Sequence, residues 1–317
     1  MIGVLKGYRP TSSGRTKTKV KDPTEESVWI ERVKKLTVIA VFSDETLLQR
    51  FVLKGGNAID LILQVGSRAS MDIDLSMSSD FSAEELQDVT ARIRRGLEEA
   101  FRSVSITPFD IELEPKPSVI TPDLAGFWGG YRVTFKLIQT TRFGELSNDL
   151  ASLRRNALLV GASSKLQIDI SKYEFYDPKE ERRLDGVRIF VCTPIMLASE
   201  KLRAICQQTK EYSEVVKRAG RAAAPRARDF VDIQVLMRHF GFDLADTKNW
   251  PLIKAMFATN RVPLSLLSKV KEYREFHRSD FQAVKDSLKP GVKLDEFDDY
   301  FDDIVRLCER LETLRNA

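Results

Sequence analysis

The sequence predicts an α/β domain followed by a helical domain. Alternating apolar residues typical of strands recur up to about residue 192, separated by stretches with helical periodicity. After Pro194 the pattern is helical to the end of the chain, apart from breaks near Gly220, Gly241 and Pro290. We therefore expect a basic flexible arm over 1–23, an α/β domain over 24–192 and a helical domain over 193–317.

Composition describes an ordinary globular protein, with 43% hydrophobic and 30% charged residues and a net charge of +4. This mild charge permits a nucleic-acid partner without requiring one. The few cysteines have no paired spacing, which argues against a disulfide framework or a zinc ribbon. No signal peptide and no apolar run of membrane-spanning length occur. We expect a cytoplasmic protein without membrane association.

Residues 1–21 are basic and contain no acidic residue, so this arm is either a disordered tail or an RNA contact. From about 24 to 50 the periodicity is helical. Phe51-Val52-Leu53 predicts a short strand that enters a Gly55-Gly56 turn, and Asn57 to Val65 predicts a helix. Ser82 and Glu85 have the spacing of a capping box and predict the start of the next helix.

Further strands are expected at 104–113, 131–138, 166–170 and 187–192, where apolar residues alternate. The polar segment 142–157 has a helical character and interrupts this series. In the acidic stretch at 294–305, apolar residues form a helical stripe, so its aspartates are expected on a solvated face. Neither His239 nor His277 lies in a catalytic or metal-binding motif, so chemistry must rest on carboxylates, lysine and arginine.

Three aspartates are candidate metal ligands. Since neighbouring side chains of a strand point to opposite faces, Asp72 and Asp74 share one face and Ile73 lies on the other. Asp169 has the same relation to Ile168. If the two strands are neighbours, the three carboxylates meet, and their repulsion calls for a divalent cation such as Mg²⁺. The alternative is that each aspartate lies in solvent at a strand edge.

The Gly55-Gly56 turn is a candidate phosphate site. Glycines let the backbone approach a ligand closely, and the following helix presents its N-terminal N–H groups. Arg68 lies between this turn and the aspartates and can add a bidentate contact.

Lys201 and Asp229 each lie within the apolar arc of a predicted helix, whereas Glu200 and Arg203 fall on the solvent side. A carboxylate in such an arc needs a partner. Lys201 and Asp229 either form a structural ion pair or both face a triphosphate cleft between the domains. We expect the second arrangement.

These segments together resemble the AbiEii/AbiGii-type nucleotidyltransferase toxins of bacterial abortive-infection and type IV toxin–antitoxin systems. The matching pieces run in the order of that family from 51 to 236: FVLKGGNAIDLIL, RASMDIDLS, KLQIDIS, LASEKLRAI and RARDFVDIQVL. The resemblance implies a polymerase-β-like nucleotidyltransferase domain with a mixed sheet, followed by a helical domain. The 142–157 insert and the basic arm have no counterpart in that pattern, which leaves the acceptor open.

The resemblance also implies roles for single residues. Asp72 and Asp74 would bind metal, with Asp169 as the third carboxylate. Nucleotide or phosphate binding falls to Lys54, Gly55, Gly56 and Arg68, and catalytic roles fall to the three aspartates, Lys201 and Asp229.

The resulting hypothesis is a nucleotidyltransferase toxin with two Mg²⁺ ions, which transfers a nucleoside monophosphate from an NTP to RNA. The first candidate acceptor is the 3′ end of tRNA. A cognate antitoxin encoded nearby would restrain the toxin. The alternatives are a non-catalytic RNA-binding module that uses the arm and the Arg218–Arg228 region, and an enzyme that modifies a small molecule.

Overall fold

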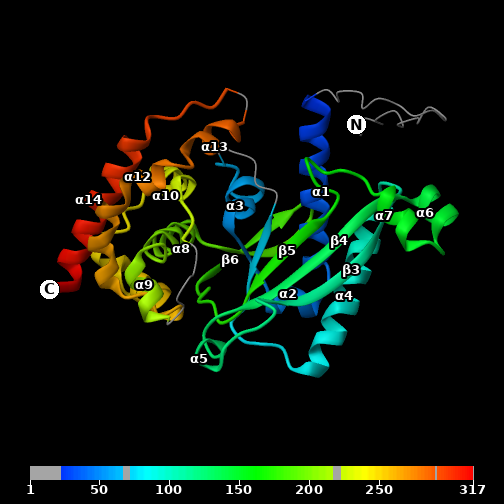
Figure 1. Cartoon of the computed structure of the whole chain (residues 1–317), viewed down its shortest axis with the longest axis horizontal. Coiled ribbons are helices and arrows are strands. Elements are labelled where there is room, and N and C mark those ends of the chain that lie inside the picture. The colour runs from blue at the N-terminus through cyan, green and yellow to red at the C-terminus, as the bar shows by residue number, and fades with distance from the viewer. Residues whose placement is uncertain (1–22, 67–71, 217–222, 290, 317) are drawn as a thin grey trace.

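A seven-stranded mixed sheet forms the centre of the α/β part of the computed structural model, which describes residues 23–66, 72–216, 223–289 and 291–316 (Figure 1). The strand order is β3-β4-β5-β2-β1-β7-β6. The β1–β7 and β2–β5 pairs are parallel, and the other pairs are antiparallel. The strands are β1 (Val52–Lys54), β2 (Ile73–Ser76), β3 (Ile106–Lys116), β4 (Gly130–Gln139), β5 (Leu166–Ser171), β6 (Lys179–Leu184) and β7 (Val187–Cys192).

Helices α1 (Pro23–Phe42) and α4 (Ala83–Arg102) pack against each other behind the sheet in Figure 1. The predicted capping box at Ser82 and Glu85 is present at the start of α4. The remaining helices of this part are α2 (Glu45–Arg50), α3 (Gly55–Asn57), the π-helix η1 (Ala58–Ile62), α5 (Pro122–Ala125), α6 (Thr140–Leu146) and α7 (Leu150–Arg155). The mixed sheet and the helices over 142–157 confirm the predicted α/β class.

The segment after β1 differs from the predicted helix over 57–65. It begins at Gly55, forms one short α-helical turn and continues as the π-helix η1. Asp60 on η1 pairs with Lys34 of α1 at 2.8 Å and with Lys289, which lies just before the last helix. Single π-turns are frequent at functional sites.

Strand β6 was not predicted. Its sequence, KEERRL, lacks apolar alternation because the strand lies at the edge of the sheet and pairs only with β7. Edge strands commonly carry charged side chains, which prevent further pairing.

After β7 the described chain is helical, as predicted, and these helices lie to the left of the sheet in Figure 1. They are α8 (Pro194–Cys206), α9 (Lys210–Val215), α10 (Ala227–Phe240), η2 (Thr247–Asn249), α11 (Trp250–Thr259), η3 (Leu264–Tyr273), α12 (Arg274–Arg278), α13 (Phe281–Asp286) and α14 (Phe297–Asn316). Helix α8 packs against α10 and α11. The boundary near 192 between two domains stays a prediction.

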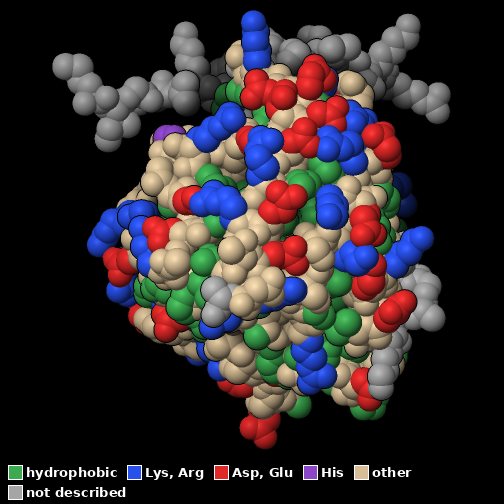
Figure 2. Space-filling model, turned by 90° about the vertical axis from the view of Figure 1, so that its left-hand side faces the viewer, with side chains coloured by type: hydrophobic (Ala, Val, Ile, Leu, Met, Phe, Trp, Pro, Cys, Tyr) green, Lys and Arg blue, Asp and Glu red, His purple; other side chains and the backbone are tan. Residues whose placement is uncertain are grey.

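The surface of the helical side carries basic and acidic side chains intermingled (Figure 2). In the acidic stretch, Phe297 and Phe301 are buried, while Asp298 and Asp302 pair with Arg274. None of the described helices is both long enough and apolar enough to cross a lipid bilayer.

Candidate active site

Four charged residues form a row across the middle of the sheet. Lys54 on β1 is directly opposite Asp74 on β2. Asp169 on β5 lies on the other side of Asp74, and Arg132 on β4 is opposite Asp169. Because residues opposite each other in adjacent strands point to the same face, the row reads cation, carboxylate, carboxylate, cation. The two strands that carry the predicted aspartates are therefore neighbours.

Gly55 brings the backbone against the Asp74 carboxylate. Its φ is +68°, and a Cβ at this position would lie 2.3 Å from Oδ2 of Asp74. Only glycine meets both requirements. Two residues later, Asn57 donates a hydrogen bond from Nδ2 to the backbone oxygen of Asp72 at 2.6 Å, which fixes the entry to β2.

The electrostatic environment of Asp74 disfavours its charged form. Burial raises the pKa of the Asp74 carboxyl to about 6, although the Lys54 ammonium acts in the opposite direction. The negative charges of Glu200, Asp169 and Asp72 add to the upward shift. Asp72 itself is exposed, just before β2 begins. A cation bound here would relieve the repulsion among these carboxylates.

Asp169 on β5 is neutralised by two cations, Arg132 from the neighbouring strand β4 and Lys116 from β3. Arg132 makes a bidentate contact with it, at 2.8 and 3.1 Å, and Lys116 lies 2.5 Å from Oδ2. Burial raises the pKa of Asp169, but the hydrogen bonds from Arg132 and Lys116 bring it below its ordinary value.

Lys54 is enclosed by carboxylates of two other segments. Its Nζ lies 2.7 Å from Glu200 on α8 and 3.5 Å from Glu174, which follows β5. Burial lowers the pKa of Lys54, but Glu174 and Glu200 raise it above its ordinary range. Arg203, also on α8, contacts Glu174 at 3.1 Å.

The expectation that Glu200 and Arg203 face solvent is wrong. Arg203 is only 3% exposed, and Glu200 is half-buried. The helical periodicity of α8 marks its most apolar arc, but this helix packs against both α10 and α11, so polar positions are covered as well.

Lys201 lies between two aspartates of helix α10. Its Nζ is 3.0 Å from Asp229 and 2.7 Å from Asp232, and all three side chains are buried. Arg226 contacts Asp229 at 3.3 Å. Burial raises the pKa of Asp229, but Lys201 and Arg226 hold it well below its usual range. The ion pair that the sequence left as one of two alternatives is present, with Asp232 as a further member.

The donor set around Asp74 has the chemistry of an Mg²⁺ site, since every donor is oxygen. The buried Oδ1 of Asn57 also has no hydrogen-bond partner among the described residues. However, in the part of the chain that the structure describes, no three His, Cys, Asp or Glu side chains are grouped closely enough to hold an ion. Arg68 and residues 1–22 lie outside the described residues.

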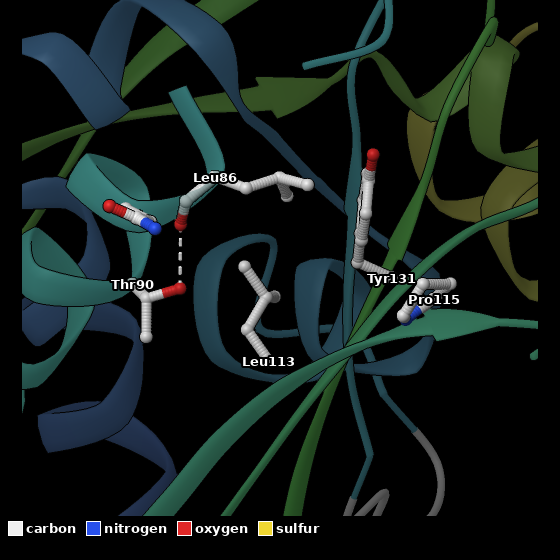
Figure 3. A pocket seen from close by; sticks show the side chains of 6 residues that line it. Leu86, Thr90, Leu113, Pro115 and Tyr131 are labelled. Carbon is white, nitrogen blue, oxygen red and sulfur yellow. Dashed lines mark hydrogen bonds between the residues drawn. The ribbon is translucent and has the colours of Figure 1, made fainter. Parts of the chain in front are cut away.

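A pocket of about 320 Å³ lies elsewhere, between α4, β3 and β4 (Figure 3). Its lining is Leu86, Gln87, Thr90, Leu113, Pro115 and Tyr131. Tyr131 and Arg132 are consecutive on β4 and so point to opposite faces of the sheet. The pocket is therefore separate from the charged row.

The sequence did not reveal the further charged residues around the predicted site, which are Lys116, Arg132, Glu174, Glu200 and Asp232. For Arg132 a signal exists, because it alternates with the apolar Tyr131 and Val133 and must lie on the polar face. The others depend on which strands and helices are neighbours.

Comparison with known proteins gives structural and family matches. The crystal structure of JHP933 from Helicobacter pylori is 15% identical with a TM-score of 0.46, over 91% of this chain and 93% of that one. An antigenic nucleotidyltransferase-like protein from Paracoccidioides brasiliensis is also 15% identical, with a TM-score of 0.35, over 81% and 94% of the two chains. No curated protein matches the sequence.

The family model described as "Nucleotidyl transferase AbiEii toxin, Type IV TA system" matches residues 38–303, and the charged row lies within this range. Since the match spans most of the chain, this protein is a nucleotidyltransferase and belongs to the AbiEii toxin family of type IV toxin–antitoxin systems, whose members act on an NTP and have an antitoxin as partner.

Proposed function

We propose that this toxin transfers a nucleoside monophosphate from an NTP to a hydroxyl group of RNA in a reaction that requires Mg²⁺. The first candidate acceptor is the 3′ end of tRNA. The observation that carries this proposal is the placement of Asp74 beside Asp169 on neighbouring strands, next to the Gly55 turn. In this reaction the acceptor oxygen attacks the α-phosphorus, the bond from that phosphorus to the bridging oxygen breaks, and pyrophosphate leaves.

The residues in and around the charged row have separate roles in this proposal. Asp72, Asp74 and Asp169 would hold Mg²⁺, which supplies positive charge for the triphosphate and for the attacking oxygen. For Asp169 to do so, Lys116 and Arg132 must release part of its carboxylate; both are partly exposed and can turn toward the phosphates. The backbone at Gly55-Gly56, together with Arg68, would bind the phosphates.

Lys201 and Asp229 complete the proposed machinery from the helical side. Lys201 adjoins Glu200, which is close enough to Asp74 to shift its pKa. To stabilise negative charge on the triphosphate, the Lys201 ammonium would have to turn out from between Asp229 and Asp232, which hold it in place.

The test is a labelling experiment with Asp74→Asn. The purified protein is incubated with Mg²⁺, total RNA and each α-labelled NTP, and the products are sized. We expect labelled RNA of tRNA length with the wild type and a loss of at least about a hundredfold with Asp74→Asn, because the ligand charge is removed. The melting temperature should not fall, since burial already disfavours the Asp74 charge.

Asp110→Asn is the matched control, since this carboxylate pairs with Arg154 and Lys136 away from the row. It should retain transfer. Label in RNA at the wild-type rate with Asp74→Asn contradicts the metal site. RNA binding without any label indicates the non-catalytic alternative, and label in small molecules alone indicates the other enzyme class.

A further inference from the structure

We propose that Lys54 is a positioning residue, which joins the part of the sheet around Asp74 to helix α8 through a buried network of four charges. The network consists of Lys54, Glu174, Glu200 and Arg203. This inference rests on the proposed catalytic role of Asp74, and it replaces the phosphate-binding role that the sequence indicated for Lys54.

The contacts form a closed set. Lys54 Nζ lies 2.7 Å from Glu200 and 3.5 Å from Glu174. On the other side, Arg203 lies 3.1 Å from Glu174 and 3.7 Å from Glu200. Arg203 also donates to the backbone oxygen of Met256 on α11 at 3.0 Å. Two cations and two carboxylates thus connect β1, the segment after β5, α8 and α11.

Burial makes these four charges dependent on one another. Lys54 is 6% exposed and Arg203 3%, and the Glu174 side chain is 8% exposed. The set is neutral as a whole, so the removal of one member leaves an uncompensated charge inside the protein. The removal of an opposite pair leaves the remainder neutral.

The surroundings of Lys54 do not suit a phosphate ligand. Its ammonium is almost fully covered and already contacts two carboxylates. A triphosphate would have to approach against both negative charges, which is unfavourable at short range.

The same surroundings suit a positioning role. Lys54 is directly opposite Asp74, and the next residue, Gly55, is held so close that a Cβ would lie 2.3 Å from the Asp74 carboxylate. A shift at the end of β1 therefore moves Gly55 relative to Asp74. On α8, Glu200 of the network is followed by Lys201. One network therefore sets the positions of both Asp74 and Lys201.

The test compares Lys54→Met with Lys54→Met/Glu200→Gln, which restores neutrality without restoring the ammonium. For the single variant we expect a lower melting temperature and, well below it, a kcat about a hundredfold lower with the KM for NTP within about twofold of wild type. The double variant should recover most of the melting temperature and bring kcat to within about tenfold of wild type.

Lys54→Met/Glu180→Gln is the control, because Glu180 lies on the edge strand β6 outside the network. It should behave as the single variant. A phosphate-binding lysine gives a different result: the KM for NTP rises in all three variants that lack Lys54, and Glu200→Gln rescues nothing. A purely structural role is shown by normal kcat in the folded single variant, and it overturns the proposal as well.

Two of the measurements do not need the acceptor. Melting temperatures of the wild type, Lys54→Met, Glu200→Gln and the double variant form a double-mutant cycle that reports on the network. Calorimetric binding of a non-hydrolysable NTP analogue to the same proteins reports on phosphate binding. If the wild type labels no RNA, the proposed function fails. Non-additive melting temperatures and unchanged analogue binding would still support the connection between Lys54 and α8 through the network. Additive melting temperatures contradict the proposed network, and they leave the proposed function intact.

Discussion

Lys201 contributes to stability as well as to the proposed chemistry, because its ammonium lies between Asp229 and Asp232. A lysine between two buried carboxylates cannot be removed without leaving negative charge uncompensated. Its stability effect and its catalytic effect must therefore be measured separately.

For Lys201→Met we expect a loss of about 3–5 kcal/mol in the free energy of unfolding, as is typical when one partner of a buried pair is removed. Lys201→Met/Asp229→Asn should recover part of this loss, because one carboxylate becomes neutral. Nucleotide transfer should stay at least about a hundredfold below wild type in both variants. Denaturant titrations and labelling rates decide the matter. A double variant with restored transfer assigns Lys201 to the scaffold alone.

At the level of single residues, the sequence was sufficient to single out the three aspartates but not the charged residues packed around the site. Asp72, Asp74 and Asp169 alternate with apolar neighbours, and this local pattern fixes the face on which they lie. Glu174 has no such pattern. Its importance comes from contacts with Lys54 and Arg203, which are far away in sequence and depend on how the elements pack.

Among the elements, the α1–α4 contact depends on one glycine. Gly96 is buried on α4, and a Cβ there would lie 2.1 Å from the backbone oxygen of Ala40 on α1. The two helix backbones therefore meet closely behind the sheet. This contact was not foreseeable from periodicity, which gives the faces of the helices and not the distance between them.

Gly96→Ala should lower the free energy of unfolding by about 1–3 kcal/mol, because the added methyl group forces the helices apart. Gly144→Ala on α6 is the matched control, since a Cβ there meets nothing within 4 Å. It should be neutral or stabilising by up to about 1 kcal/mol, as expected for alanine in place of glycine in a helix. Urea denaturation of both variants is the measurement. Equal effects at the two positions contradict the close contact.

The elements that the sequence did not predict have physical reasons. Strand β6 is held by its pairing with β7 and not by a buried face, so its sequence resembles a loop. The π-turn after Gly55 is held by Lys34 and Lys289, which bind Asp60 from both ends of the chain. Long and strongly periodic elements such as α4 were predictable because their own residues determine them.

For the whole molecule, one apolar core joins the sheet to the helices that follow it. A single cluster of buried side chains includes Leu53 on β1, Leu202 on α8 and Leu311 on α14. The network around Lys54 crosses the same boundary. The two parts are therefore not independent in energy, even though strands and helices are separated along the chain.

We expect a single cooperative thermal transition for the whole chain, with coincident curves from far-UV and near-UV circular dichroism. The reason is that neither part can lose its packing without exposing the shared core. Two resolved transitions would show instead that the sheet and the helices unfold as separate domains.

The wide separation of the joined residues also bears on when the toxin becomes active during its synthesis. Lys54 and Glu200 are 146 positions apart. At a translation rate of about 5–20 residues per second, Glu200 is added roughly 7–30 seconds after Lys54. Throughout that interval the nascent chain already carries Asp72 and Asp74 but has no partner on α8 for Lys54. A nascent chain that ends before α8 therefore has an incomplete catalytic centre, and we expect it to be inactive.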